Sequence, residues 1–131
     1  MSDQSNPKPD TPHILVVDDN AQARLLIRRI FEREGFTVDE AGDGPTAVRK
    51  ALVTPTPDLI LLDVQMPIMS GFEVLEQIRG DKRSERIPII VVTAAARDPK
   101  DIMHGFGIGA DDYMVKPFNA VEMVARARSK S

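Results

Sequence analysis

The chain has 131 residues, of which 42% are hydrophobic and 28% charged, and its formal net charge is −3 at pH 7. This composition fits one domain with its own core, and it lacks the basic excess typical of nucleic-acid-binding surfaces. The absence of cysteine excludes disulfides, a thiolate nucleophile and zinc–cysteine sites. No apolar run reaches the roughly 18 residues of a membrane span and no signal-peptide pattern is present. We therefore expect a cytoplasmic protein without direct contact to membrane or nucleic acid.

The first twelve residues differ in composition from the rest of the chain. They are polar and rich in proline, with Asn6-Pro7-Lys8-Pro9-Asp10 at their centre. Such a segment buries too little apolar surface to fold, so we expect disorder over residues 1–12. The remaining residues, 13–131, are expected to form the single domain.

Five short segments predict β-strands, at residues 13–17, 37–41, 59–62, 87–92 and 113–115. The run from Leu59 to Leu62 is entirely apolar, which indicates a strand covered on both faces. Residues 37–41 are more polar and suit the edge of a sheet.

Amphipathic segments between and after the strands predict five helices. Residues that favour helix starts open four of them: Asn20, Pro45, the Ser70–Glu73 capping box, and Asn119. In the first helix the spacing predicts an inward face of Ala23, Leu26, Ile27, Ile30 and Phe31. The last helix is expected to end near Arg128.

The fourth predicted helix, which starts at Asp98-Pro99, is weaker than the others. Its inward pair is Ile102 and Phe106, and two interior glycines, Gly105 and Gly107, cost about 1 kcal/mol each relative to alanine. We expect this helix to be the mobile part of the domain.

Alternating strands and helices with short connections predict an α/β fold with a doubly wound, five-stranded parallel sheet. The expected strand order is 2-1-3-4-5, in a flavodoxin-like three-layer sandwich whose crevice lies between the first and third strands.

Acidic residues directly follow two of the buried strands: Asp18 and Asp19 follow residues 13–17, and Asp63 follows residues 59–62. Because the carboxyl ends of parallel strands meet at one edge, we expect these three carboxylates to share the crevice. They need a counter-charge, and Mg²⁺ prefers such oxygen ligands. Thr93 and Lys116 end neighbouring strands and add a hydroxyl and an ammonium. We interpret Asp63 as a nucleophile towards phosphorus, which forms an aspartyl phosphate.

These motifs resemble the receiver domain of bacterial two-component response regulators, over about residues 13–128. The resemblance rests on Val16-Val17-Asp18-Asp19-Asn20, on residues 58–67, on Gly71, on Val92-Thr93-Ala94 and on residues 109–118.

The resemblance implies roles for individual residues. Asp63 would be the phospho-acceptor, and Asp18 and Asp19 would bind Mg²⁺ together with Asp63 and the main-chain carbonyl of Gln65. Thr93 would be the switch hydroxyl and Lys116 the ammonium that contacts the phosphoryl group. Tyr113 would be the aromatic residue coupled to the switch, and a cis Lys116–Pro117 bond is expected.

The resemblance also implies partners. A sensor histidine kinase or a histidine phosphotransfer protein would donate the phosphoryl group, which adds a charge of roughly −1.5 to −2. Thr93 would move towards this charge and Tyr113 would turn, so that the surface of the fourth helix, fifth strand and fifth helix changes. That surface would regulate a downstream protein or an effector domain missing from the sequence, or form a homodimer on phosphorylation. The sequence leaves open whether the receiver stands alone or belongs to a longer regulator.

Other functions compete with the switch, which is not itself an enzyme. A Mg²⁺-dependent phosphohydrolase with an aspartyl nucleophile commonly carries a second aspartate two residues later, where this chain has Gln65. A flavin carrier would have its phosphate repelled by Asp18 and Asp19. A receiver that only binds and is never phosphorylated would share every motif.

Several other residues receive a structural interpretation. His104 is predicted to be exposed on a helix, and the arginines of the first helix are predicted to form a solvated face, with contact to a kinase as the alternative. These arginines are Arg24, Arg28, Arg29 and Arg33.

Overall fold

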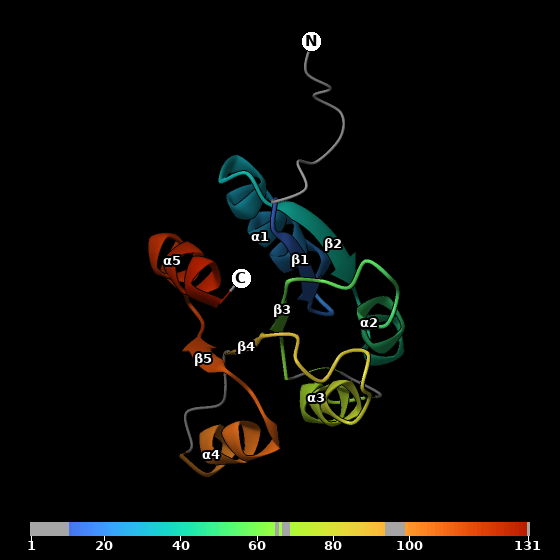
Figure 1. Cartoon of the computed structure of the whole chain (residues 1–131). Coiled ribbons are helices and arrows are strands. Elements are labelled where there is room, and N and C mark those ends of the chain that lie inside the picture. The colour runs from blue at the N-terminus through green and yellow to red at the C-terminus, as the bar shows by residue number, and fades with distance from the viewer. Residues whose placement is uncertain (1–10, 65, 67–68, 94–98, 131) are drawn as a thin grey trace.

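The computed structural model describes residues 11–64, 66, 69–93 and 99–130, which form a parallel sheet between two layers of helices (Figure 1). The strands are β1 (His13–Val17), β2 (Thr37–Ala41), β3 (Leu59–Leu62), β4 (Ile89–Thr93) and β5 (Asp112–Val115). The helices are α1 (Ala21–Arg33), α2 (Gly44–Ala51), α3 (Gly71–Arg79), α4 (Pro99–Ile108) and α5 (Ala120–Lys130). The strand order is β2-β1-β3-β4-β5, and all pairs are parallel. The predicted fold and strand order are confirmed.

The core is divided by the sheet into two clusters. Side chains of β1 alternate between them, with Leu15 and Val17 on one face and Ile14 and Val16 on the other. The first face is covered by α2 and α3, and the second by α1 and α5 (Figure 1). Both faces of the central strands are therefore buried, which explains why β1 and β3 are apolar without alternation.

Three of the predicted helix caps form the expected side-chain hydrogen bonds. The Asn20 side chain accepts from the amides of Gln22 and Ala23, at 2.9 and 3.0 Å. Ser70 and Glu73 form the complete capping box at α3. Asn119 accepts from the Glu122 amide at 3.0 Å. These caps satisfy amides that have no partner inside their helices. Helix α5 continues to Lys130, slightly beyond the predicted end near Arg128.

Two side chains predicted to face inward do not. Leu26 of α1 is 54% exposed and Phe106 of α4 is 45% exposed. Helix α1 buries only a narrow stripe, Ile27 and Phe31, against the sheet. The ring of Phe106 lies 6.0 Å from that of Tyr113, at the edge strand β5 and not over the middle of the sheet. The side chain of Ile102 lies outside the described part.

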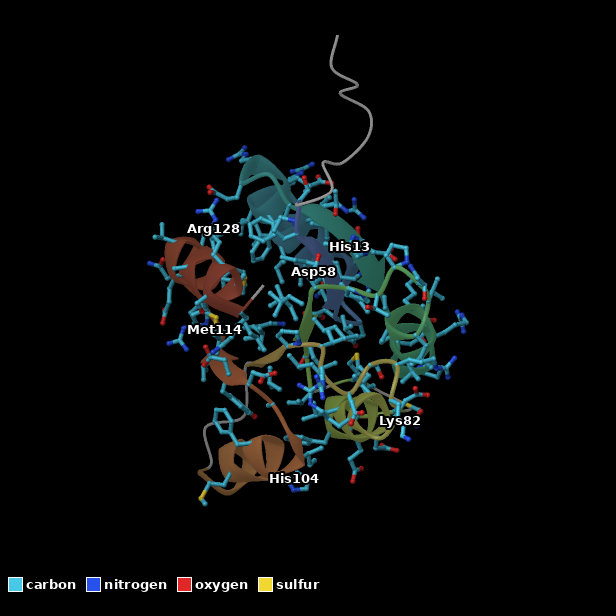
Figure 2. The ribbon with its side chains drawn as sticks, in the orientation of Figure 1. His13, Asp58, Lys82, His104, Met114 and Arg128 are labelled. Carbon is cyan, nitrogen blue, oxygen red and sulfur yellow. The ribbon has the colours of Figure 1, made fainter. Side chains whose placement is uncertain are left out.

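His104 on α4 is exposed, as predicted, and Figure 2 places it on the periphery of the molecule. Its ring nevertheless contacts Phe72 of α3 edge-on, with the centroids 4.8 Å apart. Among the described helices, none has the length and apolar character that crossing a bilayer requires.

Arg79, at the end of α3, joins three parts of the chain near the amino ends of the strands. Its guanidinium donates to the carbonyl of Gly109 at 2.9 Å, to that of Ile87 at 2.7 Å and to the Asp111 carboxylate at 2.8 Å. Asp111 also accepts from the Ile89 amide at 2.8 Å. Burial lowers the pKa of Arg79, and the charge of Asp111 opposes this effect. We call these contacts the Arg79 clamp, because they tie α3 to the start of β4 and to the α4–β5 connection.

Candidate metal centre

The ends of β1 and β3 lie side by side because of the strand register. Val17 pairs with Leu62, so the residues that follow, Asp18 and Asp63, are neighbours across the sheet. The Asp63 amide donates to the Val17 carbonyl at 2.9 Å, and the Asp18 amide donates to the Ala41 carbonyl at 3.1 Å. These backbone bonds fix the points from which both side chains emerge.

The predicted acidic cluster is present. Asp18, Asp19 and Asp63 each offer a carboxylate oxygen, and these oxygens all lie within 4.8 Å of one another. Asp18 is only 2% exposed and Asp63 only 7%, whereas Asp19 is exposed. Carboxylates this close and this buried repel one another unless a positive charge is near.

Lys116 provides one such charge. Its Nζ atom lies 2.7 Å from Asp18 Oδ2 and 3.6 Å from Asp63 Oδ2. Burial disfavours the charged ammonium, but the hydrogen bond to Asp18 and the charges of Asp18 and Asp63 outweigh burial and raise the pKa of Lys116. The Lys116–Pro117 bond is cis, as the resemblance led us to expect.

Gly71 allows α3 to start directly against the acidic cluster. Its amide donates to the Val64 carbonyl at 3.1 Å. A Cβ atom at this position would collide with the Val64 Cα and the Asp63 carbonyl oxygen. Only glycine fits this approach, so the residue maintains the path of the backbone just after Asp63.

The other predicted site residues are placed less completely. The backbone of Thr93 ends β4 and pairs with Val115, one residue before Lys116. The Thr93 side chain is not among the described parts of the structure. Gln65 lies outside the described residues. Tyr113 is half-buried on β5 beside Phe106. The switch roles of Thr93 and Tyr113 and the ligand role of Gln65 stay predictions.

Sequence reasoning missed one residue next to the cluster, Arg24. It was predicted to lie on a solvated face, yet its side chain is only 19% exposed and it donates to the Asp18 carbonyl at 2.7 Å. A signal was present in the sequence, because Arg24 and Arg28 share one face of the first helix, and Glu40 on the polar edge strand offers them an acidic partner. Both arginines contact Glu40 in the structure.

The residues of the cluster suit a hard divalent cation. Three carboxylates offer oxygen ligands, and the exposure of Asp19 leaves one side open to water or to phosphate oxygens. This donor set fits Mg²⁺, which keeps several waters and is commonly held by few carboxylates.

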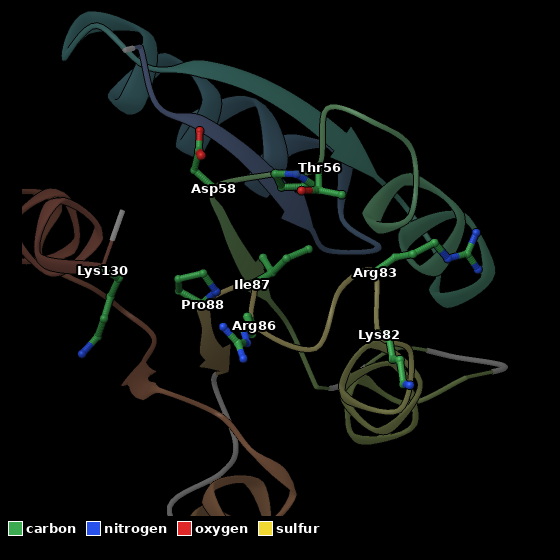
Figure 3. Close-up of a pocket in the computed structure, with 9 residues that line it drawn as sticks. Thr56, Asp58, Lys82, Arg83, Arg86, Ile87, Pro88 and Lys130 are labelled. Carbon is green, nitrogen blue, oxygen red and sulfur yellow. The ribbon is translucent and has the colours of Figure 1, made fainter. Parts of the chain in front are cut away.

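A separate hollow of about 420 Å³ lies at the opposite, amino end of the sheet (Figure 3). Its rim carries Lys82, Arg86 and Lys130, and Ile87 and Pro88 form part of its wall. Asp58 also lines it and accepts from the His13 amide at 2.8 Å; Figure 2 shows these two residues at the same end of the sheet. The hollow and the acidic cluster are therefore distinct sites.

Comparison with known proteins gives a consistent result. Residues 14–128 match the family model described as response regulator receiver domain. The chain is 46% identical over 116 residues to the transcriptional regulatory protein ResD of Bacillus subtilis, an alignment that covers 88% of this chain and 46% of ResD. It is 40% identical over 118 residues to the DNA-binding dual master transcriptional regulator RpaA of Synechocystis, covering 90% of this chain and 48% of RpaA. The chain thus spans about half the length of these relatives.

Solved structures show the same similarity. The chemotaxis protein CheY4 of Vibrio cholerae superposes with a TM-score of 0.85 at 29% identity, covering 92% of this chain and 99% of CheY4. The receiver domain of the sensor histidine kinase PA1611 of Pseudomonas aeruginosa superposes with a TM-score of 0.83 at 31% identity, covering 92% of this chain and 97% of that domain. In that structure a magnesium ion is coordinated in the active-site cleft.

Proposed function

The chain belongs to the response regulator receiver domain family, whose members are phosphorylation-activated switches, and we propose that Asp63 is its phospho-acceptor. The observation that supports this proposal is the convergence of three carboxylates and one ammonium at the carboxyl end of the sheet. Asp63 is the carboxylate at the end of the central strand β3, with Asp18 and Lys116 beside it.

We infer that Asp18, Asp19 and Asp63 hold Mg²⁺, together with the main-chain carbonyl of Gln65. When bound, the ion offsets the negative charge of the incoming phosphoryl group. The Asp63 carboxylate oxygen attacks phosphorus, and the bond between phosphorus and the donor nitrogen of a phosphohistidine breaks as the new oxygen–phosphorus bond forms. The ammonium of Lys116, 3.6 Å from Asp63, stabilises the charge on the transferred group.

The proposal includes the switch and its partners. A sensor histidine kinase or a histidine phosphotransfer protein donates the phosphoryl group in the cytoplasm. Thr93 and Tyr113 relay the change to the surface of α4, β5 and α5, which acts on a downstream protein, an effector domain or a second copy of the chain. The relatives are named as transcriptional and DNA-binding regulators, but the chain spans about half of them, so direct contact of these residues with nucleic acid is not part of the proposal.

Intact mass spectrometry tests the acceptor. Incubation with Mg²⁺ and a small phosphodonor such as acetyl phosphate should add about 80 Da, the mass of one phosphoryl group. Asp63→Asn should abolish the addition, because the amide is a poor nucleophile towards phosphorus. Asp81→Asn, which removes a half-buried carboxylate that pairs with Arg83 and lies outside the acidic cluster, should leave it intact. An adduct that survives in Asp63→Asn would contradict the proposal, and absence of any adduct in the unmodified chain would favour a receiver that only binds.

A second assay addresses the phosphohydrolase alternative. The proposed switch accepts one phosphoryl group and should not turn over an added phosphate ester such as p-nitrophenyl phosphate. Sustained turnover that Asp63→Asn abolishes would show that the chain is an enzyme.

A further inference from the structure

We propose that Arg24 is a positioning residue that holds the turn at Asp18 and Asp19 in the shape that binds the divalent cation. The inference rests on the proposed function, because it concerns the same site, but it assigns a role to a residue outside the cluster. Arg24 does not contact the carboxylates of the cluster through any described hydrogen bond. It acts on the backbone from which two of them emerge.

The guanidinium of Arg24 bridges two strands and one helix. It donates from Nη1 to the Asp18 carbonyl at 2.7 Å and from Nε to Glu40 Oε1 at 2.9 Å. The first contact is at the end of β1 and the second is on β2, while Arg24 itself belongs to α1. With two short bonds to two strands, the fork of the guanidinium has little freedom to rotate.

The surroundings of Arg24 favour this geometry. A Cβ atom at Gly42, just after β2, would lie 3.0 Å from Arg24 Nη1, so the glycine leaves room for the guanidinium. Glu40 is held from its other oxygen by Arg28 Nε at 2.6 Å. Glu40 therefore pairs with both arginines, one on each carboxylate oxygen.

The bond from Arg24 to the Asp18 carbonyl differs from the other contacts of Asp18, which involve the carboxylate. Its carboxylate accepts from the Asn20 amide at 2.9 Å and from Lys116 at 2.7 Å. A cation that takes an Asp18 oxygen as its ligand competes with the Lys116 contact directly. The Arg24 bond to the carbonyl is not in that competition, so it can keep the turn in place in both states. Groups that orient metal ligands in this way typically change metal affinity by 10- to 100-fold when they are removed.

The matched test compares Arg24→Met with Arg28→Met in calorimetric titrations with Mg²⁺. Each variant removes one cation and one partner of Glu40, but only the first removes the donor to the Asp18 carbonyl. We expect the Mg²⁺ dissociation constant to rise about tenfold in Arg24→Met and to change less than about twofold in Arg28→Met. Arg24→Lys restores the positive charge but lacks the planar guanidinium that donates to two acceptors, so it should recover only part of the affinity.

The outcomes separate the inference from the function on which it rests. If the unmodified chain does not bind Mg²⁺, the proposed function fails. If it binds and Arg24→Met binds equally well, or both methionine variants lose the same affinity, Arg24 has no positioning role. Thermal unfolding without Mg²⁺ shows whether each variant folds.

A second variant decides the question should Arg24→Met not fold. Gly42→Ala adds a methyl group 3.0 Å from Arg24 Nη1 and should weaken Mg²⁺ binding by displacing the guanidinium. Gly107→Ala is the matched control, because the added methyl group meets nothing within 4 Å. Equal affinities in the two alanine variants would overturn the inference.

Discussion

The ammonium of Lys116 lies nearer to Asp18 than to Asp63, at 2.7 Å from Asp18 Oδ2 and 3.6 Å from Asp63 Oδ2. The ammonium thus supplies positive charge to the same carboxylates that a divalent cation would bind. In the proposed reaction, Lys116 and the metal would compete for Asp18, whereas both would favour a phosphoryl group on Asp63. Lys116 should therefore weaken Mg²⁺ binding but speed the transfer of the phosphoryl group to Asp63.

Lys116→Met tests this division. Removal of the ammonium should tighten Mg²⁺ binding by about fivefold, equivalent to an ion pair of about 1 kcal/mol. It should also slow the addition of the phosphoryl group at least tenfold, because a positive charge near the transferred oxygens is lost. Titration and time-resolved intact mass measure the two effects. Lys82→Met, an exposed change of the same charge, should alter neither; weaker Mg²⁺ binding in Lys116→Met would refute the competition.

The Glu40 carboxylate predicts a pH dependence of folding. Burial disfavours its ionised form, but hydrogen bonds from Arg28 and Arg24 outweigh burial and lower the pKa of Glu40 below its ordinary value of 4.5. A carboxyl group with a lowered pKa in the folded state stabilises the fold above the unfolded pKa. That stability is lost as the pH falls through the lowered value.

Urea unfolding across a pH series measures this effect. The free energy of unfolding should decrease below about pH 4.5, and Glu40→Gln should be less stable than the unmodified chain at neutral pH but lose less on acidification. Glu34→Gln, which removes one carboxylate from an exposed pair with Arg128, is the control for the loss of a single negative charge. Identical profiles for Glu40→Gln and the unmodified chain would show that the arginine pairs contribute no pH-dependent stability.

Gly71 links the packing of α3 to the position of Asp63. Gly71→Ala forces a methyl group against the Asp63 carbonyl and the Val64 Cα, and should destabilise the fold by about 1–3 kcal/mol. Because the backbone after Asp63 must shift, Mg²⁺ affinity should fall as well. Urea unfolding and Mg²⁺ titration measure both, with Gly107→Ala as the control that adds a methyl group in open space. Wild-type affinity in a destabilised Gly71→Ala would show that the site tolerates the shift.

The elements that sequence predicted best are those with one strong local signal. The apolar runs of β1 and β3, the Asn20 cap and the Ser70–Glu73 box each depend on a few neighbouring residues, and all are found where expected. The acidic cluster was predicted because the strand order brings the residues after Val17 and Leu62 together. The same order followed from the alternation of strands and helices and from the family resemblance.

The failures involve contacts between distant segments. Periodicity placed Leu26 inward, but how much of an amphipathic helix is covered depends on its neighbours, and α1 buries only a narrow stripe. Phe106 had the right spacing but lies beside the edge strand. Arg24 was assigned to solvent because its partners, Asp18 and Glu40, belong to other elements. The charges of one helix reveal such partners only when they are compared with the acidic residue Glu40 on the neighbouring edge strand.

The Arg79 clamp limits how α4 can respond. The clamp secures the connection after α4 at the amino end of the sheet, opposite the acidic cluster. Among the described side chains of α4, His104 contacts Phe72, Phe106 lies beside Tyr113, and Ile108 packs against the core. The end of this helix next to Gly109 is therefore anchored. A structural change that begins at the acidic cluster would make α4 rotate about its anchored end at Gly109. The displacement of its surface should therefore grow with distance from Gly109.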